Sequence, residues 1–525
     1  MEKIFKQNLK RFDLLKIKNN AENHLKIMIH RNHSFEMISS VLNPFLNYFN
    51  FDASFDYSSY DDSLTFPQEM NADLHILWLD LNRYNRDTVE DFINEKILEL
   101  SSLTKSPIIL AYIGDIKQYK NDKAYIVNID NVIEELGDKA FDLEKEKYSG
   151  TRLSSKASIL IAQYLGLKII PSLFMPQIKA IVTDLDNTFY QGILGEDGID
   201  KLISNNNYQL KLREFAEQGY MICISSKNDE DEVEKMFNIR KDFKLNLKDF
   251  TCHRINWNSK AKNISSMAKE MNIGLDSILF IDDNIAEIEN VKTLIPQIKT
   301  ILFNNDESIS NVLDLYPGFL KSSITKEDKL RSQDIKANQE RLNLAKTLTK
   351  EEYFKKLDMK INITLNDIEH IDRIVELLNK TNQFILSYKR YDKFDVERIL
   401  KSNNSCIITA SMKDKLSDSG IIAILICDKE KESLVVDELT FSCRALGRNI
   451  EDIVISKMLL LAQKHLKTSN KIKINYKKGP RNAPAQKWLY EFCKQELLKD
   501  EGQLNYLLPD NIETFGLEVS EYYDK

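Results

Sequence analysis

The chain has 525 residues, of which 42% are hydrophobic and 29% charged, and its 80 acidic and 73 basic residues give a formal net charge of −7 at pH 7. This length exceeds what one hydrophobic core supports, so we expect about three domains. The mixed Lys and Glu residues give no basic surface for nucleic acid. No apolar run approaches the roughly 18 residues of a membrane-spanning helix.

The N-terminal segment MEKIFKQNLKRF lacks the apolar core of a signal peptide, so we expect a cytoplasmic protein without a membrane partner. Along the chain, helical patterns alternate with short apolar runs, which is typical of parallel sheets with crossover helices. The predicted parts are an α/β domain at 1–150, a second α/β domain at 175–305, a charged helical linker at 306–355 and a mixed α/β domain at 356–525.

Each predicted strand of the second domain is followed by polar residues. The strands are expected at 179–184, 219–226, 249–256 and 277–283, and the polar residues are Asp184 with Asp186, Ser226, Lys260, and Asp282 with Asp283. Because the carboxyl ends of parallel strands meet at one edge of a sheet, we expect these side chains to converge on one crevice. Burial of unpaired carboxylates there would cost several kcal/mol, so a compensating cation is expected.

These residue types suit phosphoryl transfer. Hard oxygen ligands favour Mg²⁺, and we predict that it is held by Asp184, Asp186, Asp282 and Asp283. Asp184 is the predicted nucleophile, which forms an aspartyl-phosphate, while Asp186 protonates the leaving oxygen and then deprotonates a water. Lys260 and Ser226 are expected to contact the phosphoryl oxygens. Taken singly, the two aspartates could mark a solvated turn, Ser226 a helix N-cap, and Lys260 an ordinary surface lysine.

The spacing of these residues leaves no room for an inserted cap domain. Only 38 positions separate Thr188 from Ser226, and 34 separate Ser226 from Lys260. We therefore expect an open site that a large substrate or a neighbouring domain of the chain closes.

The ordered set DLDNT, Ser226, Lys260 and DD resembles the haloacid dehalogenase (HAD) superfamily, with motifs DxDxT, Ser/Thr, Lys and a terminal acidic pair. The resemblance implies a capless, Rossmann-like parallel sheet and a Mg²⁺-dependent phosphatase or phosphotransferase.

In the last domain, SCRALGRN before a long helix resembles the pyrophosphate-binding loop of Gcn5-related N-acetyltransferases (GNAT), and NAPAQKWLY resembles their second signature. The resemblance implies that Arg444, Gly447, Arg448 and Asn449 hold coenzyme A or a phosphopantetheine arm. Asn449 departs from the usual Gly or Ala, so a fold kept for packing or for holding a phosphopantetheine arm is at least an equal alternative to acetyl transfer. Cys443 is a candidate thiol nucleophile, or else a buried strand cysteine.

The first domain resembles a degenerate SGNH hydrolase, without a Gly-Asp-Ser start or a late Asp-x-x-His pair. Ser34 and Asp80 are therefore expected to be structural.

Over nearly its full length the chain resembles the FkbH-like family, HAD subfamily IIIC, through stretches such as DLDNTFYQGILGEDG, CISSKND, WNSKAKNI, LFIDDN and RNAPAQ. The resemblance implies a small phosphorylated substrate, 1,3-bisphosphoglycerate, and transfer of a glyceryl unit to an acyl carrier protein. Phe189 to Gly192 replace the family's Leu-Trp-Gly-Gly, and Leu185 stands where some members have Cys. The alternatives are a plain phosphatase of surface-polysaccharide or secondary-metabolite biosynthesis and a non-catalytic carrier-docking module.

Overall fold

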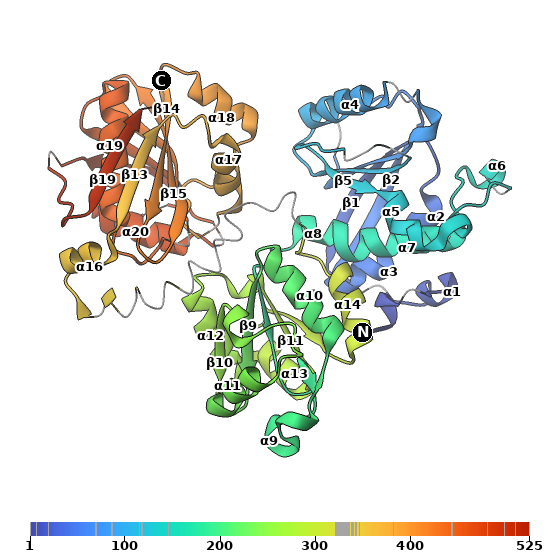
Figure 1. Ribbon diagram of the computed structural model, residues 1–525. Coiled ribbons are helices and arrows are strands. Elements are labelled where there is room, and N and C mark those ends of the chain that lie inside the picture. Colours follow the sequence, from blue (N-terminus) through green and yellow to red (C-terminus); the bar gives the residue numbers. More distant parts are fainter. Residues whose placement is uncertain are drawn as a thin grey trace. The chain divides into compact units, whose positions relative to one another are not determined.

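The computed structural model describes residues 2–523 apart from 7, 19, 69–70, 86–87, 115, 117–118, 145, 321–336, 338–340, 342–343, 346, 382, 443–444, 480, 498 and 510. The chain is an α/β protein with two parallel sheets and one mixed sheet (Figure 1). Its contacts define two compact units, Met1–Ile178 with Phe303–Ser323 and Lys179–Leu302 with Ile324–Lys525.

The first unit contains a parallel sheet in the order β2-β1-β3-β4-β5. The strands are β1 (Asn23–Arg31), β2 (Phe51–Tyr60), β3 (Leu74–Asp80), β4 (Ile108–Ile113) and β5 (Tyr125–Asn128). Strand β3 is buried throughout because alternate side chains enter two different cores, Trp78 on one face and Leu79 on the other.

Helices cover both faces of this sheet. The longer ones are α4 (Val89–Leu103), α7 (Ser155–Gln163) and α14 (Asp306–Leu315), and the shorter ones are α1 (Arg11–Leu14), α2 (Glu36–Ser39), α3 (Asn43–Leu46), α5 (Ile129–Ile133), α6 (Glu146–Ser149) and α8 (Ile170–Phe174). Helix α4 packs on the face that carries Leu79, and α7 packs on the opposite face.

One expectation from the sequence was wrong. The continuous helical stretch Ser155–Phe174 is 20 residues long and apolar enough to cross a membrane, whereas no such run was expected. Its most apolar window is 67% buried within the fold, which is consistent with a core helix of a soluble protein.

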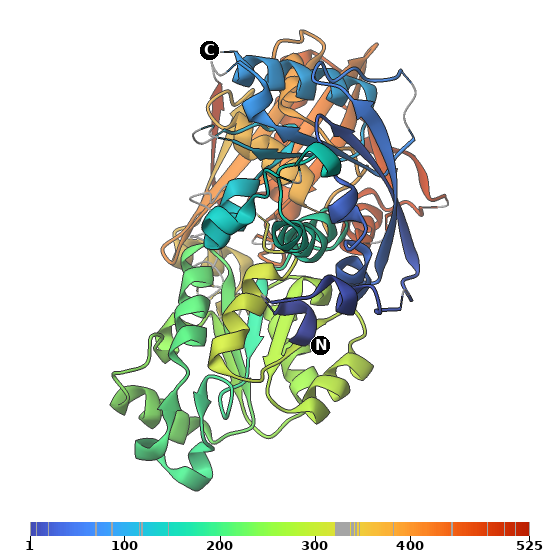
Figure 2. The same ribbon diagram turned by 90° about the vertical axis from the view of Figure 1, so that its right-hand side faces the viewer.

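The middle region, residues 179–302, forms a five-stranded parallel sheet in the order β10-β9-β6-β11-β12, flanked by helices (Figure 2). The strands are β6 (Ala180–Thr183), β9 (Met221–Ser226), β10 (Cys252–Ile255), β11 (Ile278–Asp282) and β12 (Lys299–Leu302). The first four lie where the sequence predicted them, and β12 was not predicted. The helices are α9 (Leu194–Asp197), α10 (Asn206–Glu217), α11 (Glu230–Ile239), α12 (Lys260–Glu270) and α13 (Ile285–Leu294).

A small hairpin of β7 (Tyr190–Gln191) and β8 (Ile203–Ser204) follows β6. Every residue from 179 to 302 is described, and within this range no separate domain is inserted between the strands. The carboxyl edge of the sheet therefore has a hairpin but no cap domain of its own.

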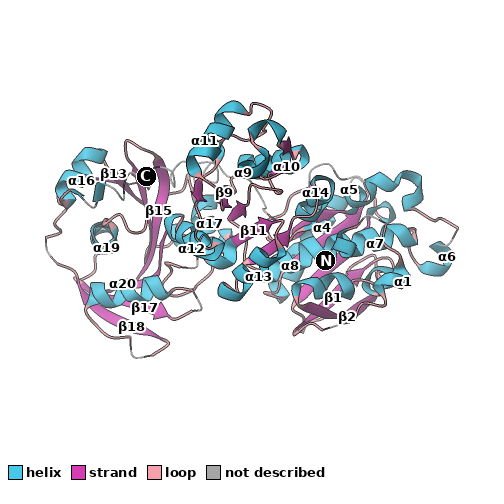
Figure 3. Ribbon diagram, turned by 90° about the horizontal axis from the view of Figure 1, so that it is seen from below, coloured by secondary structure: helices cyan, strands magenta, loops and turns pink. Residues whose placement is uncertain are grey.

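The C-terminal region has a seven-stranded mixed sheet in the order β18-β17-β16-β15-β14-β13-β19. The strands are β13 (Lys360–Leu365), β14 (Ser405–Lys413), β15 (Asp418–Glu430), β16 (Ser433–Phe441), β17 (Lys471–Lys477), β18 (Glu501–Leu507) and β19 (Glu518–Tyr523). The helices are α16 (Lys350–Leu357), α17 (Ile371–Lys380), α18 (Lys393–Leu400), α19 (Glu451–Leu466) and α20 (Ala483–Cys493). Figure 3 shows α20 beside β17 and β18.

Candidate active site

The two central strands of the middle sheet place carboxylates side by side at their carboxyl ends. Strand β6 pairs in parallel with β11, and the amide of Asp184 continues this ladder by donating to the carbonyl of Ile281 at 3.0 Å. Asp184 therefore follows β6 where Asp282 ends β11. The convergence expected from the strand order is present.

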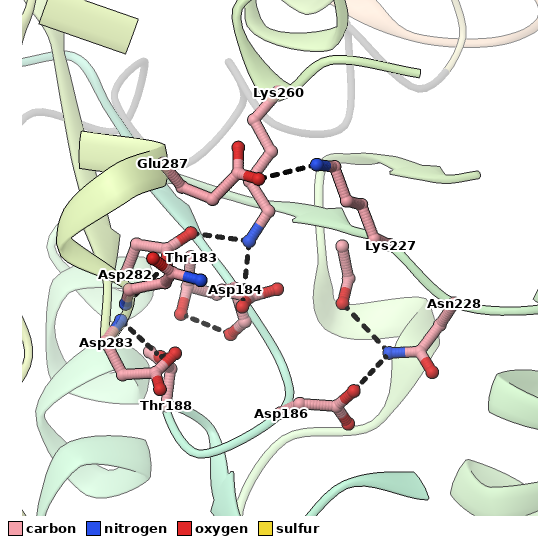
Figure 4. Close-up of polar contacts among 12 residues, drawn as sticks. Thr183, Asp184, Asp186, Thr188, Lys227, Asn228, Lys260, Asp282, Asp283 and Glu287 are labelled. Atoms are coloured by element: carbon pink, nitrogen blue, oxygen red, sulfur yellow. Dashed lines mark hydrogen bonds and ion pairs between the residues drawn. The ribbon is translucent and has the colours of Figure 1, made fainter. Parts of the chain in front are cut away.

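Lys260, the first residue of α12, lies between these carboxylates (Figure 4). Its Nζ is 2.8 Å from Oδ2 of Asp184 and 2.5 Å from Oδ2 of Asp282. Only 3% of the residue is exposed, which excludes the alternative of an ordinary surface lysine. Burial alone would lower the pKa of Lys260, but the two carboxylates outweigh it and raise the pKa above its ordinary value.

Two carboxylates contact this ammonium group, and a third lies close to both of them. Asp184, Asp282 and Asp283 each contribute an oxygen, and these oxygens lie within 4.8 Å of one another. Burial and the neighbouring Asp184 raise the pKa of Asp282, and the same two causes raise the pKa of Asp283. One cation thus faces three acids, and a second cation would relieve their repulsion.

The buried Oδ1 of Asp184 has no hydrogen-bond partner within the part of the chain that the structure describes. A buried carboxylate oxygen without a donor is costly unless a ligand or metal completes it. The hard oxygen donors and the excess negative charge fit Mg²⁺, so Asp184, Asp282 and Asp283 are the residues able to hold it.

Thr188 fixes the outer acid of this group. Its hydroxyl accepts the amide N–H of Asp283 at 3.1 Å and lies 3.4 Å from that residue's Oδ1. The threonine of the DLDNT motif is thereby tied to the second acidic motif, 95 residues away.

Asp186 is held elsewhere. Its Oδ1 accepts the hydroxyl of Tyr190 at 2.6 Å and the amide of Leu194 at 3.1 Å, and its Oδ2 accepts Nδ2 of Asn228 at 3.0 Å. The acidic group of Asp184, Asp282 and Asp283 does not include its carboxylate. The described contacts of the Asp186 carboxylate are three hydrogen bonds, and its contact with a metal stays a prediction.

Ser226, the last residue of β9, is buried, and its hydroxyl accepts Nδ2 of Asn228 at 3.1 Å. It does not cap the next helix, because Asp229 is the N-cap of α11 and accepts the amides of Asp231 and Glu232. The alternative of an N-cap serine is thus wrong.

Sequence reasoning missed Tyr190 and Asn228. Asn228 bridges Ser226 and Asp186, and Tyr190 reaches Asp186 from β7. Both lie in the quoted stretches DLDNTFYQGILGEDG and CISSKND, but neither was assigned a role. Only their spacing could have drawn attention to them, because Asn228 lies two residues after Ser226 and Tyr190 lies four residues after Asp186.

The described groups of the C-terminal loop make contacts within the protein, and ligand binding by this loop stays a prediction. The amide of Gly447 donates to Oε1 of Glu451, the first residue of α19, at 2.5 Å. Arg448 is buried and donates to the hydroxyl of Ser419 at 3.1 Å. Asn449 adopts a left-handed conformation, with φ of 60°. The remaining candidates, Cys443 and Arg444, lie outside the described residues.

Both polar residues singled out in the first domain make local contacts. The hydroxyl of Ser34 donates to Oε2 of Glu36 at 2.6 Å. Asp80 pairs with Nε of Arg152 at 2.9 Å and accepts the amide of Asn82 at 3.1 Å. These contacts agree with structural roles.

No protein-family profile and no curated protein matches the chain. Among solved structures, the N-terminal part of a Bacteroides fragilis protein, containing a phosphatase domain and complexed with Mg, is 19% identical. It covers 60% of this chain and 100% of that chain, with a TM-score of 0.44.

Two shorter structures match single regions. A HAD family enzyme from Bacteroides thetaiotaomicron, in complex with magnesium and inorganic phosphate, is 12% identical over 24% of this chain and 95% of that chain, with a TM-score of 0.20. A GNAT family acetyltransferase from Streptococcus pneumoniae is 12% identical over 28% of this chain and 99% of that chain, with a TM-score of 0.21. Likenesses at this level carry no functional argument.

Proposed function

We propose that this chain is a magnesium-dependent phosphoryl-transfer enzyme of the HAD type, with Asp184 as nucleophile. The observation that carries the proposal is the buried ammonium of Lys260 between Asp184 and Asp282, with Asp283 beside them and Oδ1 of Asp184 without a partner. A structural ion pair has no need of three acids around one lysine.

The residues have distinct tasks in this reaction. Oδ1 of Asp184 attacks phosphorus, the bond from phosphorus to the leaving oxygen breaks, and Asp186 gives that oxygen its proton. Water then attacks the aspartyl-phosphate while Asp186 takes a proton from it, and Asp184 is released. Lys260 keeps Asp184 oriented and balances charge on the phosphoryl group. Mg²⁺ held by Asp184, Asp282 and Asp283 would supply Lewis-acid stabilisation of the phosphoryl oxygens.

For the substrate, we propose the chemistry that the FkbH-like resemblance implies. In a small acyl phosphate such as 1,3-bisphosphoglycerate, the thiol of an acyl carrier protein attacks the acyl carbon, the bond from that carbon to the phosphate oxygen breaks, and phosphate leaves with the thiol proton. Asp184 removes the other phosphate, an alkyl ester, through the aspartyl-phosphate. The motif series in the middle region supports this proposal, and the cytoplasm would provide both reactants. The runner-up is a plain phosphatase, which the replacement of Leu-Trp-Gly-Gly by Phe189 to Gly192 favours.

One experiment separates the two. The full chain is incubated with 1,3-bisphosphoglycerate and candidate carrier proteins, carrier mass is read by intact mass spectrometry, and phosphate release is followed in parallel. A glyceryl adduct supports the transferase, and phosphate release without an adduct from any matched carrier supports the phosphatase. If Cys443→Ala stops loading but not phosphate release, the acyl group passes through that thiol; unchanged loading means direct transfer.

A further inference from the structure

The carboxylate of Asp186 is bound on both oxygens by groups from separate segments. Oδ1 accepts two hydrogen bonds, from the hydroxyl of Tyr190 and the amide of Leu194. Oδ2 accepts one, from Nδ2 of Asn228, which Figure 4 shows beside it. A carboxylate offers about four lone-pair sites, two on each oxygen. Among the described contacts, Oδ1 is therefore fully used and Oδ2 keeps one site.

Both side chains that bind Asp186 are themselves fixed. Tyr190 is fully buried, and its ring stacks on Phe243 with centroids 5.9 Å apart and planes 3° from parallel. Burial and the adjacent Asp186 raise the pKa of Tyr190 far above its ordinary value, so its hydroxyl keeps the proton that it donates. Asn228 is also buried, and the same Nδ2 that binds Asp186 binds the hydroxyl of Ser226.

We propose that Tyr190 and Asn228 are positioning residues that make Oδ2 of Asp186 the atom that delivers the proton to the leaving oxygen. This inference rests on the proposed function and adds which atom acts and what holds it. Tyr190 and the Leu194 amide occupy both lone-pair sites of Oδ1, so Oδ2 is the oxygen that keeps a site for the leaving group. Asn228 sets the rotation of the carboxyl group by connecting Oδ2 to the hydroxyl of Ser226, the last residue of β9.

The same geometry indicates the substrate class. When the ester bond to phosphorus breaks, an alkoxide leaving group needs the proton from Oδ2, whereas a stabilised phenolate leaves without it. A fixed proton donor is useful only for poor leaving groups. We therefore assign the site to alkyl phosphate esters, such as the phosphate of a polyol or a hydroxy acid.

The test compares two substrates across three variants of the full chain. Tyr190→Phe and Asn228→Ala each remove one donor from Asp186, and kcat/KM is measured with glycerol phosphate and with p-nitrophenyl phosphate. We expect a loss of about 10- to 100-fold on the alkyl ester, part of the 10²- to 10⁴-fold that general acid catalysis supplies. The aryl ester, which needs no proton, should lose less than about threefold.

Tyr208→Phe is the matched control, because it removes another buried tyrosine hydroxyl of the same region, one that bonds Thr183 at 2.9 Å. It should change both substrates by one common factor. Thermal unfolding of every variant identifies any that fails to fold. If one of the two positioning variants does not fold, the other still tests the proposal.

The outcomes are distinguishable. Equal losses on both esters in Tyr190→Phe and Asn228→Ala would overturn the positioning proposal and leave phosphoryl transfer intact. Wild-type protein that releases phosphate from neither ester in the presence of Mg²⁺ would overturn the proposed function, and the positioning proposal with it. Selective loss on the alkyl ester in either folded variant, absent from Tyr208→Phe, supports the proposal.

Discussion

The sheet of β1 to β5 and the sheet of β6 and β9 to β12 are both five-stranded and parallel. They differ in how the acidic side chains at their carboxyl edges are neutralised. In the first, Asp80 at the end of β3 is matched by one arginine, Arg152, and its backbone N–H and C=O both bond the side chain of Asn32. In the second, one lysine pairs with both Asp184 and Asp282, and Asp283 lies beside them.

The two edges differ in charge balance. The acid at the first edge is neutralised by its own arginine, whereas the acids at the second edge outnumber the lysine beside them. Both edges stand where ligands bind in α/β folds, so topology alone does not distinguish them. The balance of charge does, because an acid paired one to one is stable as it is, whereas three acids on one ammonium call for another cation.

The largest effect on activity is expected when one aspartate at each edge is replaced by asparagine. Asp184→Asn should lower phosphate release by about 10⁴-fold or more, because the nucleophile is lost. Asp80→Asn should leave phosphate release unchanged and destabilise the first region by about 1–3 kcal/mol, because Arg152 loses its partner. Phosphate assays and urea unfolding of both variants check this, and comparable losses of activity in the two would remove the distinction between the edges.

Removal of divalent metal should have the next largest effect. Excess chelator should bring phosphate release to background, and added Mg²⁺ should restore it, because Asp184, Asp282 and Asp283 then regain their counter-charge. Mg²⁺ should also raise the melting temperature by mass action, since it binds only the folded site. Full phosphate release in excess chelator would contradict the metal assignment.

Low pH should destabilise the first region through two buried histidines rather than through its acidic residues. Burial, with His75 nearby, lowers the pKa of His30 to about 3, and burial, with Arg83 and Arg152 nearby, lowers that of His33 to about 3. Both values lie below the ordinary 6.5, so the stability these rings contribute is complete above about pH 6.5 and is lost as the pH falls toward 3. At the acid end, the lowered pKa of each ring reduces the free energy of unfolding by up to about 5 kcal/mol.

Fluorescence of Trp78 can report this transition, because the chain has three tryptophans and the other two, Trp257 and Trp488, lie in other regions. In a background with both replaced by Phe, His33→Phe keeps a ring stacked on Trp78 and removes the titrating group. The acid midpoint should then move to lower pH. An unchanged midpoint would mean that His33 does not control acid unfolding.

The smallest effect is expected at Thr188, which touches only the outermost acid. Thr188→Ala should weaken the apparent affinity for Mg²⁺ by about 10- to 100-fold, the usual effect of losing a group that orients a metal ligand. Activity at saturating Mg²⁺ should recover. Thr188→Ser keeps the hydroxyl and should titrate like wild type, so an equal defect in Thr188→Ser would point to packing of the methyl group instead.

The sequence predicted the α/β class and four of the five middle strands, because buried parallel strands appear as continuous apolar runs. It also placed Lys260 and the acids together, since strand ends of a parallel sheet share an edge. The strand β12 was missed because its residues KTIL form too short an apolar run. The separation of Asp186 from the acidic group was missed because it depends on side-chain contacts across 42 residues, from Asn228.

The C-terminal loop shows another limit of sequence patterns. The residues SCRALGRN resemble the sequence of a ligand-binding loop. The pattern does not reveal that the amide of Gly447 is bonded to Glu451, or that Arg448 is buried and bonded to Ser419. Such outcomes depend on packing between segments far apart in the chain.

Because the amide of Gly447 is bonded to the carboxylate of Glu451, a ligand anion would have to compete with this side chain for the amide. The Glu451 carboxylate is only four residues from the amide that it accepts, so its effective concentration there is on the order of millimolar or higher. A nucleotide pyrophosphate at micromolar concentration would rarely displace it, unless further contacts made up the difference. Any ligand anion that uses the Gly447 amide would therefore first have to displace the Glu451 carboxylate.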